Sequence, residues 1–596
     1  LNIDKIIDIA KSAKADALHP GYGFLSENPV FAETITSEGI IYIGPSVNSL
    51  KLFGNKWQAR QFAVKLGIPV AKAYNGSDSE LTRLLSSSDF PILVKPQWGG
   101  GGKSIRVYNS IEELQADFDK KTGYNALTYN NGYFFEKFIP DIRHVEIQIL
   151  GDMNGNVLPL FDRECTVQRK FQKIIEEAPV PFIKDDLRER IISDALKIAK
   201  KSGYYSAGTI EFMLDKTGNY YFLEANARIQ VEHGVTEIIT GVDIVREQIN
   251  IAENGKLPDY LYGIKPTGHA IEARIYAEDP DKEFMPSSGK ISLVNLPDGE
   301  DIRIDHSLKP GDVICEDFDP LLAKIIVKRH NRTEAVNRIT EILTNTAIHG
   351  IRHNIGLLTD VFQSEEFNSG NFSTRHITTR YHYSNILNSP DLEIAFAALF
   401  ISLMKLPEEK EALSHLPYHG YWRIYQVISC SINEINYRFV ITRITEDLMT
   451  LRYQGNEYTF ICKSLTNDVI NFTDESGKNR RLIYSFNDDN YTINLGSGPV
   501  QYFFFRDDLL GRKCENRNTS EEGHHHIITA PLNGKILKIN TFNEEFIEKG
   551  KSLVIIESMK MENEIRMPVK GKVKKIHIKT GDHVREGDVM FELEMI

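Results

Sequence analysis

The sequence lacks paired cysteines, long apolar runs and an excess of positive charge. Its five cysteines are scattered and odd in number, without Cys-x-x-Cys spacing, which favours buried or idle thiols in a reducing compartment. No stretch approaches the ~20 apolar residues that span a bilayer, so we expect no membrane span. The formal net charge of -12 argues against a general nucleic-acid surface, so we expect no nucleic-acid partner.

An initiator methionine and a signal peptide are also absent. The chain begins at Leu1, and Asn2 precedes an amphipathic pattern that predicts a helix from Ile3. We therefore expect the chain to begin inside a domain, with any targeting peptide upstream of Leu1. The sequence does not decide between the cytoplasm, expected for a bacterial protein, and the mitochondrial matrix, expected for a eukaryotic one.

What is present is enough for several folding units. With 596 residues, of which 41% are hydrophobic and 26% charged, the chain predicts a multidomain globular protein. Alternating helix and strand patterns over residues 1–383 predict one large α/β unit. Over residues 384–506, a helical pattern around Leu392 to Leu406 and several β-type runs predict a helix plus an antiparallel barrel. These runs are Tyr437 to Thr442, Met449 to Tyr453, Tyr458 to Cys462 and Tyr491 to Leu495.

A polar segment over residues 507–526 follows, and we interpret it as a linker. It ends in three consecutive histidines, His524, His525 and His526. A metal site and a remnant tag are the alternatives for these histidines. Because three consecutive side chains cannot converge on one ion without strain, a solvated linker tract is the favoured interpretation.

A repeat occupies the last part of the chain, residues 527–596. Pro531 to Glu557 matches Pro568 to Glu594 at one constant spacing, and each copy has two short strand patterns around a polar stretch. The two copies predict a small all-β sandwich with two-fold symmetry. Lys560 lies at the hairpin that joins them, with a methionine on each side, which suits covalent modification. An ordinary solvated turn lysine is the alternative.

Four glycines, Gly99 to Gly102, follow the apolar strand pattern that leads to Lys95. Such a run lets backbone N–H groups face phosphates, while Lys95 and Lys103 add positive charge. The spacing is not that of a Walker loop, and a structural turn is an equal alternative.

Polar side chains alternate along the segment from Glu211 to Glu232. Two strand patterns joined by a turn place Glu211 nearly opposite Glu224. If the second strand continues to Glu232, its polar face carries Glu224, Asn226, Arg228, Gln230 and Glu232. Two carboxylates and an amide suit Mg²⁺, a small oxyanion could lie beside the arginine, and Glu232 could take a proton. A solvated edge strand is the alternative.

Several long motifs resemble the biotin carboxylase component of acyl-CoA carboxylases, an ATP-grasp fold. They are His19 to Asn28, the glycine run, Arg143 to Gln148, Cys165 to Pro179 and Arg228 to His233. The resemblance covers about Asn2 to Tyr383 and implies an ATP-grasp lid over about 75–140 and a C-terminal part over 141–383. The repeat resembles the hammerhead-like biotinyl domain of the same enzymes. Lipoyl domains share the repeat but usually place an acidic residue before the lysine.

The resemblance implies roles for individual residues. The ATP site would contain Lys56, Lys95, Gly99, Gly100, Gly101, Gly102, Glu136, Lys137, His144 and Gln168. Mg²⁺ or Mn²⁺ would be held by Glu211, Glu224 and Asn226. Bicarbonate would meet Lys173, Arg228, Gln230 and Val231, with Glu232 as general base, Arg303 stabilising the biotin enolate and Lys560 carrying biotin. Carboxyphosphate, made from ATP and bicarbonate, would release CO₂ beside biotin.

Three features depart from the family pattern. Phe171 stands where a polar residue is usual, Ser104 stands where glycine is usual, and the first strand with its glycine-rich turn is missing before Leu1. The two substitutions would alter ATP affinity rather than abolish the chemistry. The missing strand would leave the N-terminal subdomain truncated.

The resemblance also implies partners. No segment resembles a carboxyltransferase, so we expect a separate carboxyltransferase β subunit in a hetero-oligomer. This subunit would dock on the 384–506 unit, and the acyl-CoA would be reached only through it. A biotin protein ligase would modify Lys560. The run Tyr418 to Arg423 resembles 3-methylcrotonyl-CoA carboxylase α subunits, with propionyl-CoA or acetyl-CoA as alternative substrates. A non-catalytic carrier scaffold and a lipoyl-carrying acyltransferase component are the rival classes.

Overall fold

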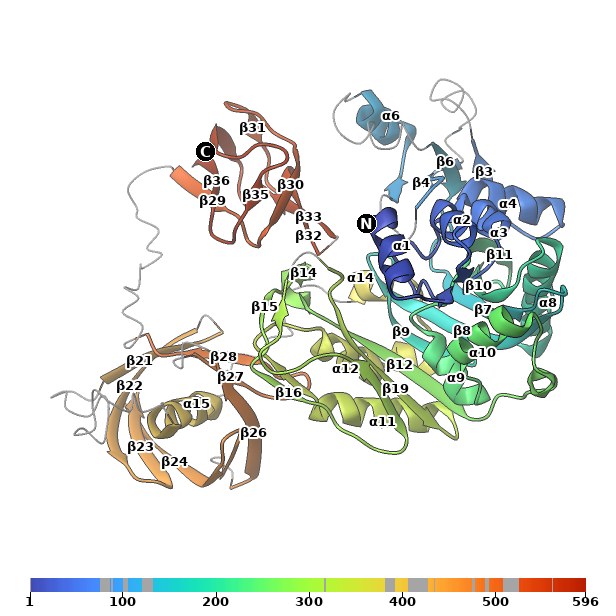
Figure 1. Ribbon diagram of the computed structural model, residues 1–596. Coiled ribbons are helices and arrows are strands. Elements are labelled where there is room, and N and C mark those ends of the chain that lie inside the picture. The colour runs from blue at the N-terminus through green and yellow to red at the C-terminus, as the bar shows by residue number, and fades with distance from the viewer. Residues whose placement is uncertain are drawn as a thin grey trace.

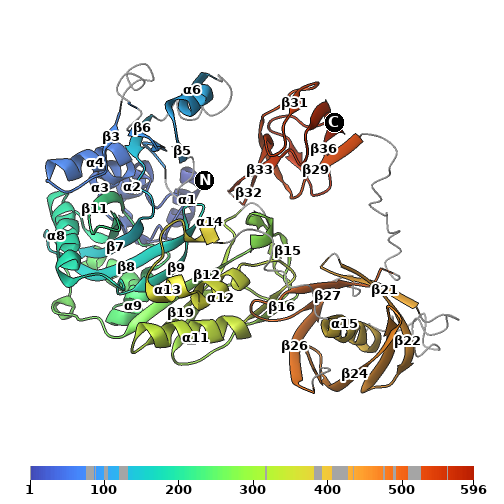
Figure 2. The ribbon, with the colours of Figure 1, turned by 180° about the vertical axis from the view of Figure 1, so that it is seen from behind.

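A computed structural model describes most of the chain in three folded units (Figures 1 and 2). The described residues are 2–75, 86, 89–99, 105–119, 132–315, 318–380, 392–405, 427–433, 435–473, 477–487, 492–507, 525–559 and 561–595. Several predictions fall outside them, namely those on Gly100, Gly101, Gly102, Lys103, Ser104, Tyr418 to Arg423, Cys514, His524 and Lys560.

The N-terminal part is helical around one small sheet. Its elements are α1 (Ile3–Ser12), β1 (Ala17–Leu18), α2 (Pro29–Ser37), β2 (Ile41–Tyr42), α3 (Val47–Gly54) and α4 (Lys56–Lys65), with β1 and β2 parallel. Asn2 caps α1 as predicted, because its side chain accepts a hydrogen bond from the backbone of Lys5. α4 contacts the edge strand of the central sheet, which places the start of this helix beside the site described below.

A small four-stranded sheet follows, in the region expected to form a lid. It contains β3 (Ala73–Tyr74), β4 (Ile92–Pro96), β5 (Arg106–Tyr108) and β6 (Tyr133–Lys137) in the order β3-β6-β4-β5, with α6 (Ile111–Asp119) beside it. β4 and β6 are antiparallel neighbours, so Lys95 and Glu136 come close together from adjacent strands.

The central sheet has eight strands in the order β11-β10-β7-β8-β9-β12-β19-β17. Their bounds are β7 (Arg143–Gly151), β8 (Val157–Arg169), β9 (Gln172–Ala178), β10 (Ser206–Leu214), β11 (Tyr220–Asn226), β12 (His269–Tyr276), β17 (Ile302–His306) and β19 (Leu321–Arg329). All paired strands are antiparallel. α8 (Asp185–Lys201), α9 (His233–Thr240) and α10 (Ile244–Asn254) pack against it.

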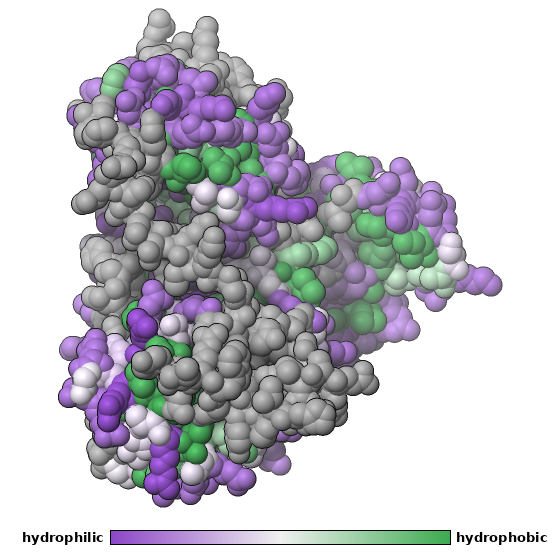
Figure 3. All heavy atoms as spheres, turned by 90° about the vertical axis from the view of Figure 1, so that its left-hand side faces the viewer, coloured by the Kyte–Doolittle hydropathy of each residue, from purple (hydrophilic) through white to green (hydrophobic). Residues whose placement is uncertain are grey.

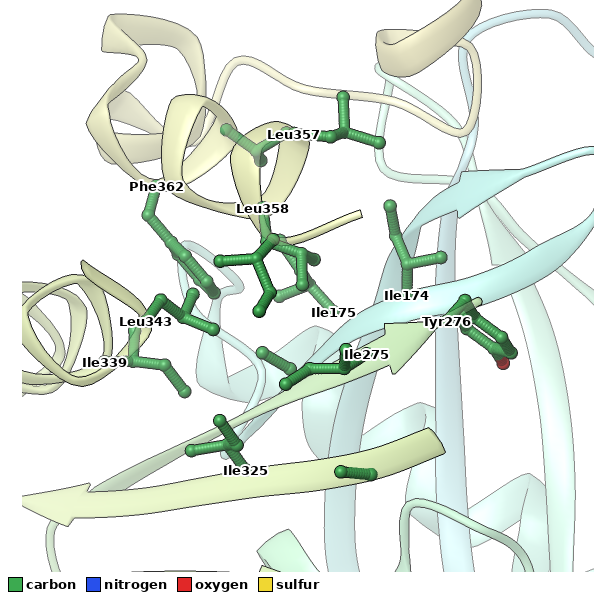
Figure 4. Packing of buried hydrophobic residues seen from close by; sticks show 14 of the residues in the cluster. Ile174, Ile175, Ile275, Tyr276, Ile325, Ile339, Leu343, Leu357, Leu358 and Phe362 are labelled. Atoms are coloured by element: carbon green, nitrogen blue, oxygen red, sulfur yellow. The ribbon is translucent and has the colours of Figure 1, made fainter. Parts of the chain in front are cut away.

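The rest of the α/β unit covers the other end of this sheet. It consists of η2 (Asp259–Leu261), β13 (Glu278–Asp279), η3 (Pro280–Lys282), β14 (Met285–Pro286), β15 (Gly289–Lys290), β16 (Leu293–Asn295), β18 (Val313–Ile314), α11 (Arg332–Asn345), β20 (Ala347–His349), α12 (Ile355–Gln363), α13 (Glu365–Ser369) and α14 (His376–Arg380). Figure 4 shows the core here, where Leu343 and Phe362 from the helices meet Ile175, Ile275 and Ile325 from the strands. This packing holds β9, β12 and β19 in fixed register beneath the helices.

The second unit is a closed barrel around one helix, as predicted. The strands are β21 (Val427–Ile432), β22 (Ile435–Ile444), β23 (Leu448–Tyr453), β24 (Asn456–Leu465), β25 (Val469–Thr473), β26 (Asn479–Phe486), β27 (Thr492–Leu495) and β28 (Tyr502–Phe505). α15 (Leu392–Lys405) fills the barrel (Figure 1), which explains why Ile394 to Ile401 are buried on every side.

Hydrogen bonds between buried groups join the barrel to the α/β unit. The two ring nitrogens of His349 lie 2.9 Å from the Ser485 hydroxyl and 2.9 Å from the Gly496 carbonyl oxygen. Ser292 and Ser485 share a further hydrogen bond of 2.8 Å. The backbone N–H of Gly498 donates to the Thr346 carbonyl at 2.7 Å. We call this contact the interdomain joint.

The C-terminal unit confirms the predicted two-fold sandwich. One sheet has the order β29-β36-β34-β31 and the other β33-β32-β30-β35. The bounds are β29 (His525–Thr529), β30 (Gly534–Ile539), β31 (Phe546–Ile547), β32 (Ser552–Ser558), β33 (Met561–Arg566), β34 (Gly571–Ile576), β35 (His583–Val584) and β36 (Val589–Met595). The strands correspond one to one across the repeat. β29 begins inside the segment predicted as a linker, because it pairs with β36.

The surface, the helices and the cysteines can be compared with the expectations from composition. The face in Figure 3 is mostly hydrophilic where it is coloured, with small hydrophobic patches. Among the described helices, none is long and apolar enough to cross a membrane. The described cysteines Cys165, Cys315, Cys430 and Cys462 form no disulfide with one another, and all but Cys315 are buried.

Candidate functional site

The two predicted metal-binding acids lie on neighbouring strands. Glu211 of β10 and Glu224 of β11 are direct partners in the register, as predicted. Glu211 accepts hydrogen bonds from Asn226 at 2.6 Å and from Gln230 at 2.9 Å. Glu224 pairs with the ammonium of Lys56 at the start of α4. Buried Glu211 and Asn226 and half-buried Glu224 therefore form one group with the oxygen donors that Mg²⁺ prefers.

The expected continuation of this strand to Glu232 is wrong. β11 ends at Asn226, and the chain leaves the sheet before α9 begins at His233. The pairing of β11 with β10 stops at Asn226 opposite Thr209, although β10 extends on to Ser206, so the segment after Asn226 turns away from a strand that is still present. The side chains of Gln230 and Glu232 nevertheless turn inward, so the polar face is formed by an irregular segment rather than by a strand.

Lys173 of β9 lies at the centre of the site. Its ammonium is 2.6 Å from Glu232, 3.1 Å from Glu211 and 2.6 Å from Glu146. Burial alone would raise the pKa of Glu211, but Lys173 and His144 hold it well below its usual value. His144 lies 2.8 Å from the Glu211 carboxylate, and Gln168 donates to its other ring nitrogen at 2.8 Å.

Glu232 is enclosed by cations. Arg274 of β12 donates to its second oxygen at 2.8 Å. Burial would raise the pKa of Glu232, but Lys173, Arg274 and Arg163 lower it. The carboxylate is therefore ionised at neutral pH and able to accept a proton. The preceding carbonyl, that of Val231, accepts a hydrogen bond from Lys324 at 2.6 Å.

Arg303 pairs with two acids other than Glu232. Its guanidinium contacts Glu237 at 2.6 Å and Asp305 at 3.0 Å, at the β17 edge of the sheet. The structure instead places Arg274 on Glu232, and sequence reasoning missed this arginine. The signal for it was a pair of charged residues, Glu272 and Arg274, inside the otherwise apolar run that forms β12.

Arg228 connects the site to the N-terminal motif. Its guanidinium lies 3.2 Å from the Glu27 carboxylate and donates to the Asn226 amide oxygen at 3.2 Å. Burial lowers the pKa of Arg228, but Glu27, Glu232 and Glu211 more than offset it. The predicted oxyanion-binding arginine is thus positioned by residues from both the first motif and β11.

The predicted nucleotide-binding residues lie on the small sheet and beside it. Lys95 and Glu136 are buried and paired with each other. Lys137 donates to the carbonyls of Asp89 at 3.0 Å and Phe90 at 3.1 Å, so its ammonium is held by the backbone. Gly99 has φ 109°, a conformation that favours glycine.

A second group of buried acids lies behind Arg274. Glu176 Oε1 is 2.6 Å from its guanidinium, and Glu272 is 3.8 Å away. Desolvation raises the pKa of Glu176 to about 8 and that of Glu272 to about 7. Arg163, also missed, joins Glu146 to the Gln230 amide oxygen at 3.2 Å. These residues orient the cations and amides that face Glu232 and Glu211.

Family models match most of the α/β unit and the C-terminal unit. Residues 1–50 match the "Biotin carboxylase, N-terminal domain", and residues 55–260 match the "Carbamoyl-phosphate synthase L chain, ATP binding domain". Residues 272–379 match the "Biotin carboxylase C-terminal domain". Residues 526–593, which include Lys560, match the model described as "Biotin-requiring enzyme".

Known proteins match over the full length of this chain. The methylcrotonoyl-CoA carboxylase subunit alpha of Rattus norvegicus is 33% identical, over 100% of this chain and 85% of its own. The propionyl-CoA carboxylase alpha chain of Sus scrofa is 32% identical, over 100% of this chain and 83% of its own.

A solved structure matches the α/β unit. It is the biotin carboxylase domain of the Hydrogenobacter thermophilus 2-oxoglutarate carboxylase, with MgADP, ADP and bicarbonate, at 39% identity and a TM-score of 0.62 over 64% of this chain and 85% of that one. The ATP-grasp fold and the biotinyl sandwich are therefore both confirmed. The chain belongs to the α subunits of biotin-dependent acyl-CoA carboxylases, which join a biotin carboxylase to a biotin carrier.

Proposed function

We propose that this site uses ATP and bicarbonate to carboxylate biotin carried on Lys560. The observation that carries the proposal is the position of one ammonium, that of Lys173, between Glu211 and Glu232. Magnesium-bound phosphates would lie on the Glu211 side of this ammonium. Bicarbonate, whose proton Glu232 would remove, would lie on the Glu232 side. The solved relative binds MgADP and bicarbonate, which supports the same ligands for this chain.

Glu211 and Glu224, with Asn226 beside them, are the proposed ligands of Mg²⁺. The metal would offset charge as the γ-phosphoryl group moves to bicarbonate. Lys56 and His144 contact the two carboxylates. We propose that phosphates draw the Lys56 ammonium away from Glu224 when nucleotide binds. The remaining nucleotide contacts would come from Lys95, Glu136, Lys137, Gln168 and the run Gly99 to Gly102.

The bicarbonate pocket is proposed to consist of Lys173, Arg228, Gln230 and the backbone at Val231. Glu232 would act as the general base, which its ionised carboxylate allows. We assign stabilisation of the biotin enolate to Arg274 in place of Arg303, because Arg274 shares Glu232 with Lys173. Arg303 would hold Glu237 and Asp305 at the edge of the sheet.

The proposed domains follow the three units. Residues 1–383 would form the biotin carboxylase, 384–506 the docking domain for a carboxyltransferase β subunit, 507–526 the linker and 527–596 the biotinyl carrier. A biotin protein ligase would load Lys560. The two named relatives act, by their names, on methylcrotonoyl-CoA and propionyl-CoA. We propose 3-methylcrotonyl-CoA as the acceptor, with propionyl-CoA as the second candidate.

The first experiment measures bicarbonate-dependent ATP hydrolysis by the purified chain with free biotin. We expect activity in the unchanged chain and a loss of at least about 100-fold in Glu232→Gln, since general-base catalysis contributes on that order. The control is Glu253→Gln, at an exposed position of α10. Absence of bicarbonate-dependent hydrolysis in the unchanged chain would support the non-catalytic scaffold instead.

Two further measurements address the carrier and the acceptor. Intact-mass analysis distinguishes biotin from lipoate on Lys560, and Lys560→Arg should carry neither. Purification of the chain with its endogenous partners, followed by a panel of acyl-CoA substrates, identifies the acceptor. Preference for propionyl-CoA over 3-methylcrotonyl-CoA in that panel would overturn our assignment.

A further inference from the structure

The hairpin β32–β33 of the C-terminal unit reaches the α/β unit near β14 (Figure 1). Met561, the residue after Lys560, has its sulfur 3.5 Å from a guanidinium nitrogen of Arg169. Met285 of β14 packs against the hydrophobic core of the C-terminal unit. Two separate contacts therefore join the carrier to the carboxylase part, and one of them involves a sequence neighbour of Lys560.

Arg169 is a rigid partner for this methionine. It is 1% exposed and pairs with the fully buried Glu278. Its guanidinium lies 5.3 Å from the ring centroid of Phe284 and 5.8 Å from that of Tyr276. Gln172 accepts a further hydrogen bond from it at 2.9 Å. With both ring contacts and both polar contacts in place, the guanidinium offers a fixed surface to a polarisable and adaptable thioether.

This surface belongs to the same hairpin as the reaction site. In the β8–β9 register, Gln168 pairs with Lys173 and Arg169 pairs with Gln172. Arg169 is thus one rung away from Lys173, which contacts Glu232 at 2.6 Å. The turn between β8 and β9 is held against the segment before β14, because the Lys170 ammonium donates to the Glu283 carbonyl at 3.0 Å.

We propose that Arg169, Phe284 and Met285 form a carrier seat, in which Arg169 receives Met561 and Met285 packs against the core of the C-terminal unit, and that this seat delivers Lys560 to the Lys173–Glu232 site. The proposal rests on the function assigned to that site. It adds a recognition step, in which the carrier is selected by its own surface and not by biotin alone. Free biotin would bypass the seat.

The test compares carrier-bound and free biotin in the biotinylated full chain. One assay follows transfer of labelled bicarbonate to chain-borne biotin in a single turnover, and the other follows bicarbonate-dependent ATP hydrolysis with free biotin. We expect Met285→Asp to slow the first at least about tenfold, because the carrier loses its apolar contact with the seat and its effective concentration beside the site falls. Hydrolysis with free biotin should change less than about twofold.

Two variants serve as controls. Met285→Leu keeps an apolar side chain and should carboxylate chain-borne biotin at the unchanged rate. Met153→Asp makes the same substitution at an exposed turn between β7 and β8 and should also be silent. Unchanged transfer in Met285→Asp would overturn the carrier seat. Absence of bicarbonate-dependent ATP hydrolysis with free biotin in the unchanged chain would overturn the proposed function instead. The two failures are therefore distinguishable.

Discussion

Lys173 Nζ lies 2.6 Å from Glu232 Oε1 in the interior of the α/β unit. The same ammonium is 3.1 Å from Glu211, so one side chain connects the proposed metal site to the proposed base. Because both carboxylates depend on this cation for their lowered pKa, the two halves of the site are electrostatically linked.

Replacing Lys173 should therefore affect more than one step. In Lys173→Met, three buried carboxylates lose a partner, so the pKa of Glu232 should rise. Because the cation between Glu211 and Glu232 is gone, bicarbonate-dependent ATP hydrolysis should fall at least about 100-fold. The free energy of unfolding should fall by about 3 to 5 kcal/mol, as for a broken buried ion pair. Chemical denaturation and the hydrolysis assay measure both effects. Lys200→Met, on the exposed face of α8, is the control, and full activity in Lys173→Met would contradict the assignment.

The two arginines should respond differently to the same substitution. Arg274→Lys should lower the rate of free-biotin carboxylation by about 100-fold, since a lysine lacks the planar, pre-organised guanidinium that lies between Glu232 and Glu176. Arg303→Lys, which alters contacts to Glu237 and Asp305, should lower it by less than about tenfold. Both rates are measured at saturating ATP. A larger effect at Arg303 would return the enolate role to that residue.

Metal dependence should follow Glu224. Removing divalent ions with a chelator should abolish hydrolysis, and Glu224→Gln should raise the half-saturating Mg²⁺ concentration at least about tenfold, because a charged ligand is lost. Titration of Mg²⁺ at fixed ATP measures this shift. Glu33→Gln, at an exposed position of α2, should titrate like the unchanged chain. A Mg²⁺ requirement unaltered by Glu224→Gln would remove Glu224 from the metal site.

The interdomain joint predicts a pH dependence of stability. Burial lowers the pKa of His349 to about 4, against 6.5 for an ordinary histidine. Between these values the unfolded chain binds a proton that the folded chain does not, so stability is fully present above pH 6.5 and falls as the pH drops towards 4. The loss for His349 is at most about 3 kcal/mol.

Denaturation of the chain across this pH range measures the slope. His353 is buried nearby with a pKa of about 3 and adds to the same trend. His349→Gln, which cannot titrate, should flatten part of the slope, while His306→Gln on the exposed side of β17 should leave it unchanged. A slope identical in all three proteins would show that His349 does not titrate on unfolding.

The sequence predicted local features well. The repeat gave the symmetric sandwich, and the turn between two strand patterns placed Glu211 opposite Glu224. Both predictions depend on residues that are close together along the chain, where periodicity and turn residues determine the local structure. The alternation after Glu224 was extended too far, because an alternating pattern of polar residues does not reveal where the chain turns away from the neighbouring strand, here after Asn226.

The missed residues came from distant strands. Arg274 of β12 lies between Glu176 of β9 and Glu232 only because antiparallel pairing brings β9 and β12 together in the sheet. Periodicity assigns each residue to a face but not to a neighbour across the sheet. Arg303 illustrates the same limit, since its strand lies at the opposite edge from Glu211 and Glu224.

The interdomain joint fixes the geometry of delivery. His349, Ser292 and Ser485 fasten the barrel to the α/β unit through buried hydrogen bonds. A partner held on the barrel would therefore stand at a constant distance and angle from Glu232. Under the proposed function, changing the length of the 507–526 segment would alter how often the carrier reaches the carboxylase site or the partner. The relative positions of these two sites would not change, because the interdomain joint sets them.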